Sequence, residues 1–163
     1  MHQEINRFAI ERLAHLGGLD LNVHLERSIG LTLDSAVQGT ELGQRIIRGG
    51  ASEDEPVLRS MHHFHDPTRD AGLVGVSAAS WALGTVQSTW PSGSLFGGDY
   101  SWPTANRCFF KGLTGYEYDP GSLRYVQVAG SPAEREEYLA EAFRALGQVM
   151  HLVADRDTGR SRS

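Results

Sequence analysis

The chain has 163 residues, of which 40% are hydrophobic, and a formal net charge of -5. This composition supports one folded domain with a single core, and the acidic balance argues against stable nucleic-acid binding through a broad basic surface. The sequence contains no signal-peptide core and no apolar run of the roughly 18–20 residues that cross a bilayer. It has one cysteine, Cys108, which excludes an internal disulfide and a cysteine-based zinc site.

The N-terminal part predicts three helices that end at glycines. Apolar side chains recur at helical spacing over residues 3–16, and Gly17-Gly18 follows. A second helix is predicted for residues 22–29. The third is predicted for residues 41–47, where Gly49-Gly50 should stop it.

The middle of the chain predicts less regular structure. Residues 51–70 indicate an irregular segment with a short helical piece at 57–61. Residues 71–83, AGLVGVSAASWAL, fit either a helix or a buried strand, and we favour the helix. Residues 86–100 are rich in glycine, serine and proline and predict a long loop.

The C-terminal part contains the clearest helix. A helix is predicted for residues 101–113, and residues 114–130 read as a second loop. Ser131 and Glu134 then form a capping-box pattern, and an apolar pattern continues to Asp155. We therefore expect an all-α fold: one helical domain over residues 1–155, followed by a polar, disordered tail at 156–163.

Polar residues in three places suggest a metal site. His151 and Asp155 lie one turn apart on the last helix, inside an otherwise apolar run. HHFHDP, residues 62–67, is a short histidine-rich segment, and SEDE, residues 52–55, precedes it. His2 stands at the start of the first helix.

Each pattern alone also has a simpler explanation. His151 could be a hydrogen-bonded core histidine, the histidine-rich and acidic segments could be solvated loops, and His2 could lie on a frayed helix end. Together, however, imidazole nitrogens and carboxylate oxygens from distant segments are the ligands that zinc takes.

Three motifs resemble the zinc-dependent bacterial phospholipases C and the related fungal single-strand nucleases. HQEINRFAI is similar to the first-helix segment of that family, and HHFHDP to its histidine-aspartate-proline segment. AFRALGQVMHLVAD is similar to its His-x-x-x-Asp helix, and it is the most specific of the three.

The resemblance implies an all-α fold around a trinuclear zinc cluster and hydrolysis of a phosphodiester, in a phospholipid or a nucleic acid. It places zinc ligands at His2, His63, His151 and Asp155, with Asp155 bridging two ions. It also places the catalytic aspartate, which approaches the metal, at Asp54, with Glu53 as the alternative. The family's members lead us to expect an extracytoplasmic or secreted protein.

Two departures from the family pattern limit these expectations. The family's mature amino terminus, a tryptophan before the first-helix histidine, has no counterpart before His2. The Pro-x-His continuation that follows the last helix in the family is replaced by RDTGRSRS. We therefore expect an N-terminal portion or a shortened relative of the enzyme, with a partial metal cluster that could be inactive.

Two other functions stay open on the sequence. The chain could bind metal without catalysis, because family ligands are missing. It could instead be an interaction module that uses the aromatic-rich loop at residues 86–102, which contains Trp90 and Phe96.

Overall fold

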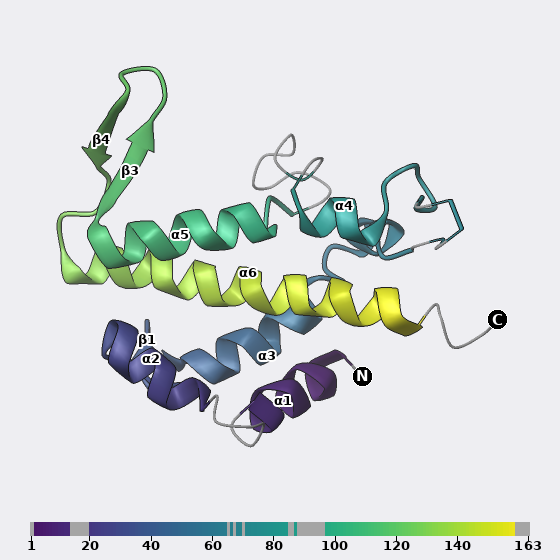
Figure 1. Ribbon diagram of the computed structural model, residues 1–163, viewed down its shortest axis with the longest axis horizontal. Coiled ribbons are helices and arrows are strands. Elements are labelled where there is room, and N and C mark those ends of the chain that lie inside the picture. Colours follow the sequence, from purple (N-terminus) through teal and green to yellow (C-terminus); the bar gives the residue numbers. More distant parts are fainter. Residues whose placement is uncertain are drawn as a thin grey trace.

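The computed structural model describes residues 2–13, 20–64, 66, 68–69, 71–84, 87 and 97–158. Helices dominate this part of the chain, so the expectation of a mainly α-helical protein is confirmed (Figure 1). The elements are α1 (His2–Leu13), α2 (Leu21–Ile29), β1 (Ala36–Val37), β2 (Thr40–Glu41), α3 (Leu42–Ser52), the 3-10 helix η1 (Val57–His62), α4 (Ala78–Ala82), α5 (Trp102–Thr114), β3 (Tyr116–Asp119), β4 (Arg124–Gln127) and α6 (Pro132–Thr158).

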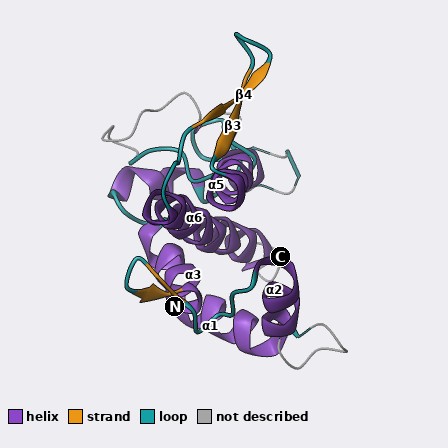
Figure 2. Cartoon of the chain, turned by 90° about the vertical axis from the view of Figure 1, so that its left-hand side faces the viewer, coloured by secondary structure: helices purple, strands orange, loops and turns teal. Residues whose placement is uncertain are grey.

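The long helix α6 is the centre of the fold. It packs against α5 along one side and against α3 along another, and α4 contacts its C-terminal part (Figures 1 and 2). The helix α1 packs against α3 and also contacts α6. The main core includes Phe143 and Leu139 of α6 together with Leu42 and Ile46 of α3. A second, smaller core joins Trp81 of α4 to Leu152 near the end of α6.

The glycines that we expected to end the third helix lie inside it, because α3 continues to Ser52. Gly49 packs against Gly147 of α6, and a Cβ atom on either glycine would collide with backbone oxygen of the facing helix, that of Arg144 or Ile46. Glycine is therefore present here to let two helices approach closely, a tertiary reason that outweighs its poor helix propensity.

One other expectation about secondary structure was wrong, and another holds only in part. Residues 114–130 contain the antiparallel hairpin β3–β4, which projects from the helices (Figure 2). The carboxylate of Asp119 accepts hydrogen bonds from the backbone N–H groups of Gly121 and Ser122 and so stabilises the hairpin turn. Within residues 71–83 only the five residues of α4 are α-helical, because the preceding segment turns at Gly75, which has a positive φ of 80°.

The capping box at the start of α6 is confirmed. The backbone N–H of Glu134 donates to the Ser131 hydroxyl, and the Glu134 carboxylate accepts from the N–H groups of Gly130 and Ser131. At its other end α6 continues to Thr158, so the first three residues of the expected tail are helical. Residues 159–163 lie outside the described part of the chain.

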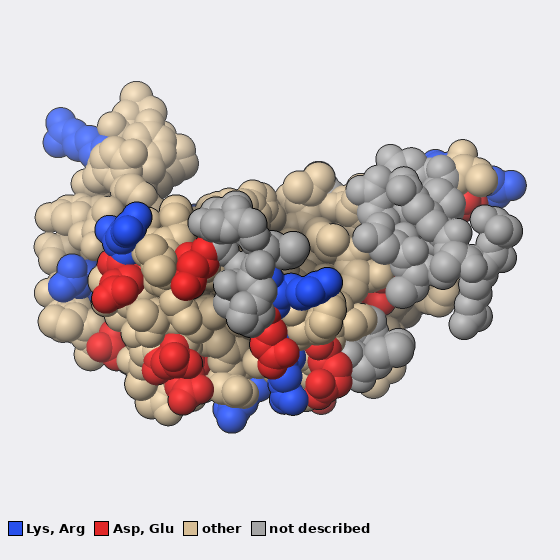
Figure 3. Space-filling model, turned by 60° about the horizontal axis from the view of Figure 1, so that its bottom comes forward, with Lys and Arg blue, Asp and Glu red and all other residues tan. Residues whose placement is uncertain are grey.

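The helices agree with the expectation that the chain has no transmembrane segment. Among the described residues, no helix combines the length and the apolar character needed to span a bilayer. On the face drawn in Figure 3, Lys and Arg side chains are scattered among Asp and Glu side chains rather than gathered in one patch.

Candidate metal centre

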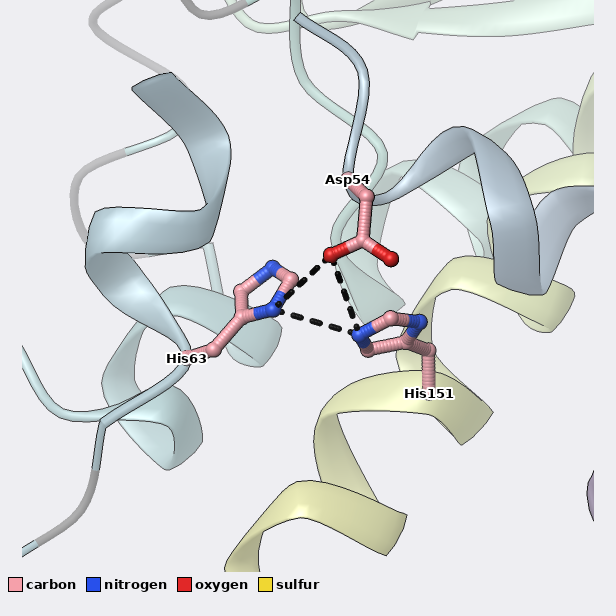
Figure 4. Close-up of side chains that lie close together, drawn as sticks. All are labelled: Asp54, His63 and His151. Carbon is pink, nitrogen blue, oxygen red and sulfur yellow. Dashed lines mark hydrogen bonds and ion pairs between the residues drawn. The ribbon is translucent and has the colours of Figure 1, made fainter. Parts of the chain in front are cut away.

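Side chains from three separate segments converge beside the C-terminal half of α6 (Figure 4). Asp54 follows α3, His63 follows η1, and His151 lies on α6. His63 Nδ1 lies 3.2 Å from His151 Nε2 and 3.4 Å from Asp54 Oδ1, and the third side of this triangle, from His151 Nε2 to Asp54 Oδ1, is 3.7 Å. The three donor atoms can hold one metal ion.

Asp155 adds a second carboxylate to the same two imidazoles. Its Oδ2 atom lies 3.2 Å from His63 Nδ1 and 3.1 Å from His151 Nε2. The helical spacing that places His151 and Asp155 on one face of α6 thus brings both to the cluster, as expected. Asp155 is therefore available as a further ligand of an ion held by the histidines.

The orientation of His151 depends on the close crossing of α3 and α6. The crossing places the backbone oxygen of Gly50 2.5 Å from His151 Nδ1, so this nitrogen carries the proton and donates it to the carbonyl. Nε2, the other ring nitrogen, faces His63 and Asp54. Asn6 of α1 stabilises the contact between α3 and α6, because its buried amide donates to the backbone oxygens of Ile46 and Gly147.

The four side chains differ in their contact with solvent. His151 is fully buried, and the side chains of His63 and Asp155 are 11% and 17% exposed. Asp54 is 49% exposed. The cluster is thus anchored on buried imidazoles and opens to solvent at Asp54, an arrangement that allows water to reach a bound ion.

Without a metal ion, the charged neighbours of His63 favour its protonated form. Burial lowers the pKa of His63, but the neighbouring carboxylates of Asp155 and Glu53 outweigh burial and raise that pKa to about 9. His63 Nδ1 and His151 Nε2 lie 3.2 Å apart, at hydrogen-bond distance. A metal ion would therefore displace a proton from His63 when it binds.

The structure distinguishes the two acidic residues that the sequence left open. Asp54 reaches the cluster, whereas the buried carboxylate of Glu53 binds the guanidinium of Arg59 and the indole N–H of Trp81, each at 2.7 Å. His62 is also directed elsewhere: its ring stacks on Trp81, and burial, followed by the charge of Arg59, lowers its pKa.

Other residues singled out in the sequence lie outside the described part of the chain. This applies to His65, Trp90 and Phe96, and to the side chain of His2, although the backbone of His2 is the first residue of α1. The placement of His2 as a ligand stays a prediction.

A buried polar network beside the cluster was missed by the sequence analysis. Arg59 Nη2 donates to the side-chain oxygens of Glu53, Gln87 and Gln148, and Nη1 donates to the backbone oxygen of Gly98. One signal could have indicated it. Gln148 interrupts the apolar pattern of α6 one turn before His151 and thus on the same side of the helix.

Comparisons of the chain with protein-family models, with curated proteins and with solved structures return no match.

Proposed function

We propose that the protein is a zinc-dependent phosphodiester hydrolase of the type found in the zinc-dependent phospholipases C and single-strand nucleases. One observation carries the proposal: the donor atoms of Asp54, His63 and His151, from three distant segments, lie within 4.8 Å of one another. The three sequence motifs that resemble this family support it, because two of them supply these histidines.

The chemistry and the size of the cluster favour zinc. Imidazole nitrogen and carboxylate oxygen suit zinc better than calcium or magnesium, which take mainly oxygen ligands. Tetrahedral zinc with bonds of about 2.0–2.1 Å separates its ligand atoms by about 3.3 Å. The separations of 3.2, 3.4 and 3.7 Å among the three donor atoms match this value with little rearrangement.

Bound zinc would lower the pKa of a water ligand and neutralise charge on a phosphodiester. The residues of the chain supply the rest. His63 and His151 hold the site from buried positions, and the carboxylate of Asp155 contacts both imidazole rings. Asp54 is half exposed, so its carboxylate can orient the attacking water and accept its proton.

The substrate proposal covers phosphodiesters in phospholipid and in nucleic acid, which share the bond that is cleaved. The net charge of -5 weakens non-specific attraction to nucleic acid and to anionic lipid surfaces, so recognition would depend on the metal centre itself. An extracytoplasmic location follows from the family resemblance and belongs to the same proposal.

Zinc binding is the first test. After dialysis against trace zinc, the wild-type chain should retain the metal, measured by elemental analysis. The double variant His63→Ala/His151→Ala should lose it. His24→Ala, which removes an exposed histidine of α2, is the matched control and should bind like wild type. Absence of zinc from the wild-type chain, or equal zinc in the double variant, would refute the metal site.

Turnover is the second test, and it separates an enzyme from a metal-binding domain without catalysis. A chromogenic phosphodiester should be hydrolysed in the presence of zinc, and Asp54→Asn should abolish the turnover while folding is kept. Zinc binding without turnover would favour the non-catalytic domain.

A further inference from the structure

Glu53 lies beside the candidate metal site but is not one of its candidate ligands. It is a fully buried carboxylate next in sequence to Asp54, and its own side chain does not join the Asp54–His63–His151 cluster. Removing a carboxylate from water costs free energy unless the carboxylate is paired and hydrogen-bonded. Its burial here therefore indicates a role other than packing.

The position of Glu53 is fixed by contacts to both of its oxygens. Oε2 pairs with Arg59 at 2.7 Å, and Oε1 accepts the indole N–H of Trp81 at 2.7 Å. Arg59 is in turn held by the network through Gln87, Gln148 and Gly98, and its guanidinium lies 5.3 Å from the centre of the Trp81 ring. The carboxylate therefore has little freedom to turn.

This fixed carboxylate faces the back of a metal-ligand candidate. Glu53 Oε1 lies 3.7 Å from His63 Nε2, the ring nitrogen that points away from the cluster. Nε2 is buried, and it has no hydrogen-bond partner within the described part of the chain. Glu53 is thus the negative charge placed to favour a proton on that nitrogen.

We propose that Glu53 is a positioning residue, which holds His63 with its Nε2–H toward the Glu53 carboxylate and with the Nδ1 lone pair toward the metal ion. The proposal rests on the metal site proposed above and adds a residue that is not a ligand. His151 is oriented in the complementary way, since its Nδ1–H donates to Gly50 and its Nε2 faces the cluster. Each histidine then donates its second ring N–H to an acceptor on the side away from the metal ion, Glu53 for His63 and Gly50 for His151. Such an acceptor fixes the tautomer and increases the basicity of the ligand nitrogen.

The network also connects the two histidines. Gln148, which accepts from Arg59, lies one turn before His151 on α6, and Arg59 binds Glu53 behind His63. The guanidinium thus joins the support of one ligand to the helix that carries the other. Arg59, a buried cation, contacts both segments and so fixes the distance between them.

The test compares zinc affinity in Glu53→Gln and Glu55→Gln. Both variants remove one negative charge close to the site, but Glu55 is exposed. Glu53→Gln should weaken zinc binding about 10–100-fold, as loss of a carboxylate behind a ligating histidine does in other metal sites. Glu55→Gln should keep the wild-type affinity, and competition with a chromogenic zinc chelator measures both.

A second variant and a spectrum of the wild-type chain cover the case in which Glu53→Gln fails to fold. The double variant Glu53→Gln/Arg59→Met removes both buried charges together, which costs far less stability than leaving one unpaired, and it should show the same loss of affinity. In an isotope-labelled imidazole NMR spectrum of the zinc-bound wild type, His63 should carry its proton on Nε2.

The outcomes separate the inference from the proposed function. A folded Glu53 variant that binds zinc like wild type, or a His63 ring that binds zinc through Nε2, would overturn the role of Glu53 while the metal site stands. A wild-type chain that binds no zinc would overturn the metal site, and the role of Glu53 with it.

Discussion

The two halves of α6 pack in different ways. In the first half, Leu139, Ala140 and Phe143 enter the main apolar core with α3, and Phe109 of α5 meets the Phe143 ring edge to face. In the second half, Gln148 and His151 are just as buried but contact polar groups of Arg59, Gly50 and His63. One continuous helix thus joins an apolar anchor to a polar site.

The difference between the halves shows how a site can be rigid although its own contacts are costly. Burial of apolar side chains contributes roughly 25 cal/mol per Å² of surface removed from water. Buried polar groups contribute little net stability, because hydrogen bonds in the protein replace hydrogen bonds to water. The first half of α6 should therefore carry stability and the second half metal binding, and the two should separate under mutation.

The largest expected effect is on stability alone. Phe143→Ala opens a cavity in the main core and should lower the free energy of unfolding by about 3–5 kcal/mol. Zinc affinity of the folded variant should stay at the wild-type value, because Phe143 lies two turns before His151. Denaturant titration and chelator competition measure the two quantities. Val153→Ala, which shortens an exposed side chain of the same helix, is the control. A parallel fall of zinc affinity in Phe143→Ala would show that the halves are coupled.

A change at the boundary of the halves should affect both quantities. Gly147→Ala places a Cβ against the backbone oxygen of Ile46, and such overpacking costs about 1–3 kcal/mol of stability. The helices must separate, which moves Gly50 away from His151 and should weaken zinc binding as well. Gly43→Ala adds a Cβ to the same α3 at an ordinary distance of 3.4 Å from Leu33, and it should leave zinc affinity unchanged. Unchanged zinc affinity in Gly147→Ala would mean that the crossing does not set the orientation of His151.

The sequence predicted the elements whose signals are local. The capping box of α6, the spacing of His151 and Asp155, and the short helix near His63 need only neighbouring residues, and the structure bears them out. The course of α3 through Gly49 could not be predicted in this way, because the reason for the glycine is a helix that lies far along the chain.

The hairpin and the polar network were missed for different reasons. In YEYD and RYVQ, Tyr118 and Tyr125 stand on either side of an Asp-Pro-Gly turn, a hairpin signal that the prediction of a loop over residues 114–130 did not use. The network around Arg59 gathers side chains from four separate segments, and no spacing in the sequence marks such a set. Only the tertiary fold shows that Glu53 and Asp54, adjacent in sequence, have different surroundings.

The stability of the cluster beside the second half of α6 should also depend on alkaline pH when the metal is removed. The pKa of His63 is raised from 6.5 to about 9, because the carboxylates of Asp155 and Glu53 outweigh burial, so its protonated form stabilises the fold. This contribution is fully present below pH 6.5 and is lost as pH rises through about 9. Unfolding of the metal-free chain across this interval should therefore show falling stability, and His63→Gln should remove the trend. A His63 that titrates near 6.5 by NMR would contradict the arrangement.

The smallest expected effect lies at the opposite end of α6 and in acid. Hydrogen bonds from the backbone N–H groups of Ser131 and Gly130 lower the pKa of Glu134 below its usual 4.5, so ionised Glu134 stabilises the fold above that pH, and its contribution is lost as pH falls through the lowered pKa. Glu134→Gln keeps a side chain that can still cap the helix, so it should reduce stability only slightly at neutral pH. The difference in unfolding free energy between wild type and variant should vanish in acid, and zinc affinity should not change. A difference that persists at low pH would mean that the carboxylate acts by packing rather than by charge. If the difference does vanish in acid, the Glu134 and His63 variants together assign the loss of stability in acid to the N-terminal end of α6. They assign the loss of stability in alkali to the end beside the cluster.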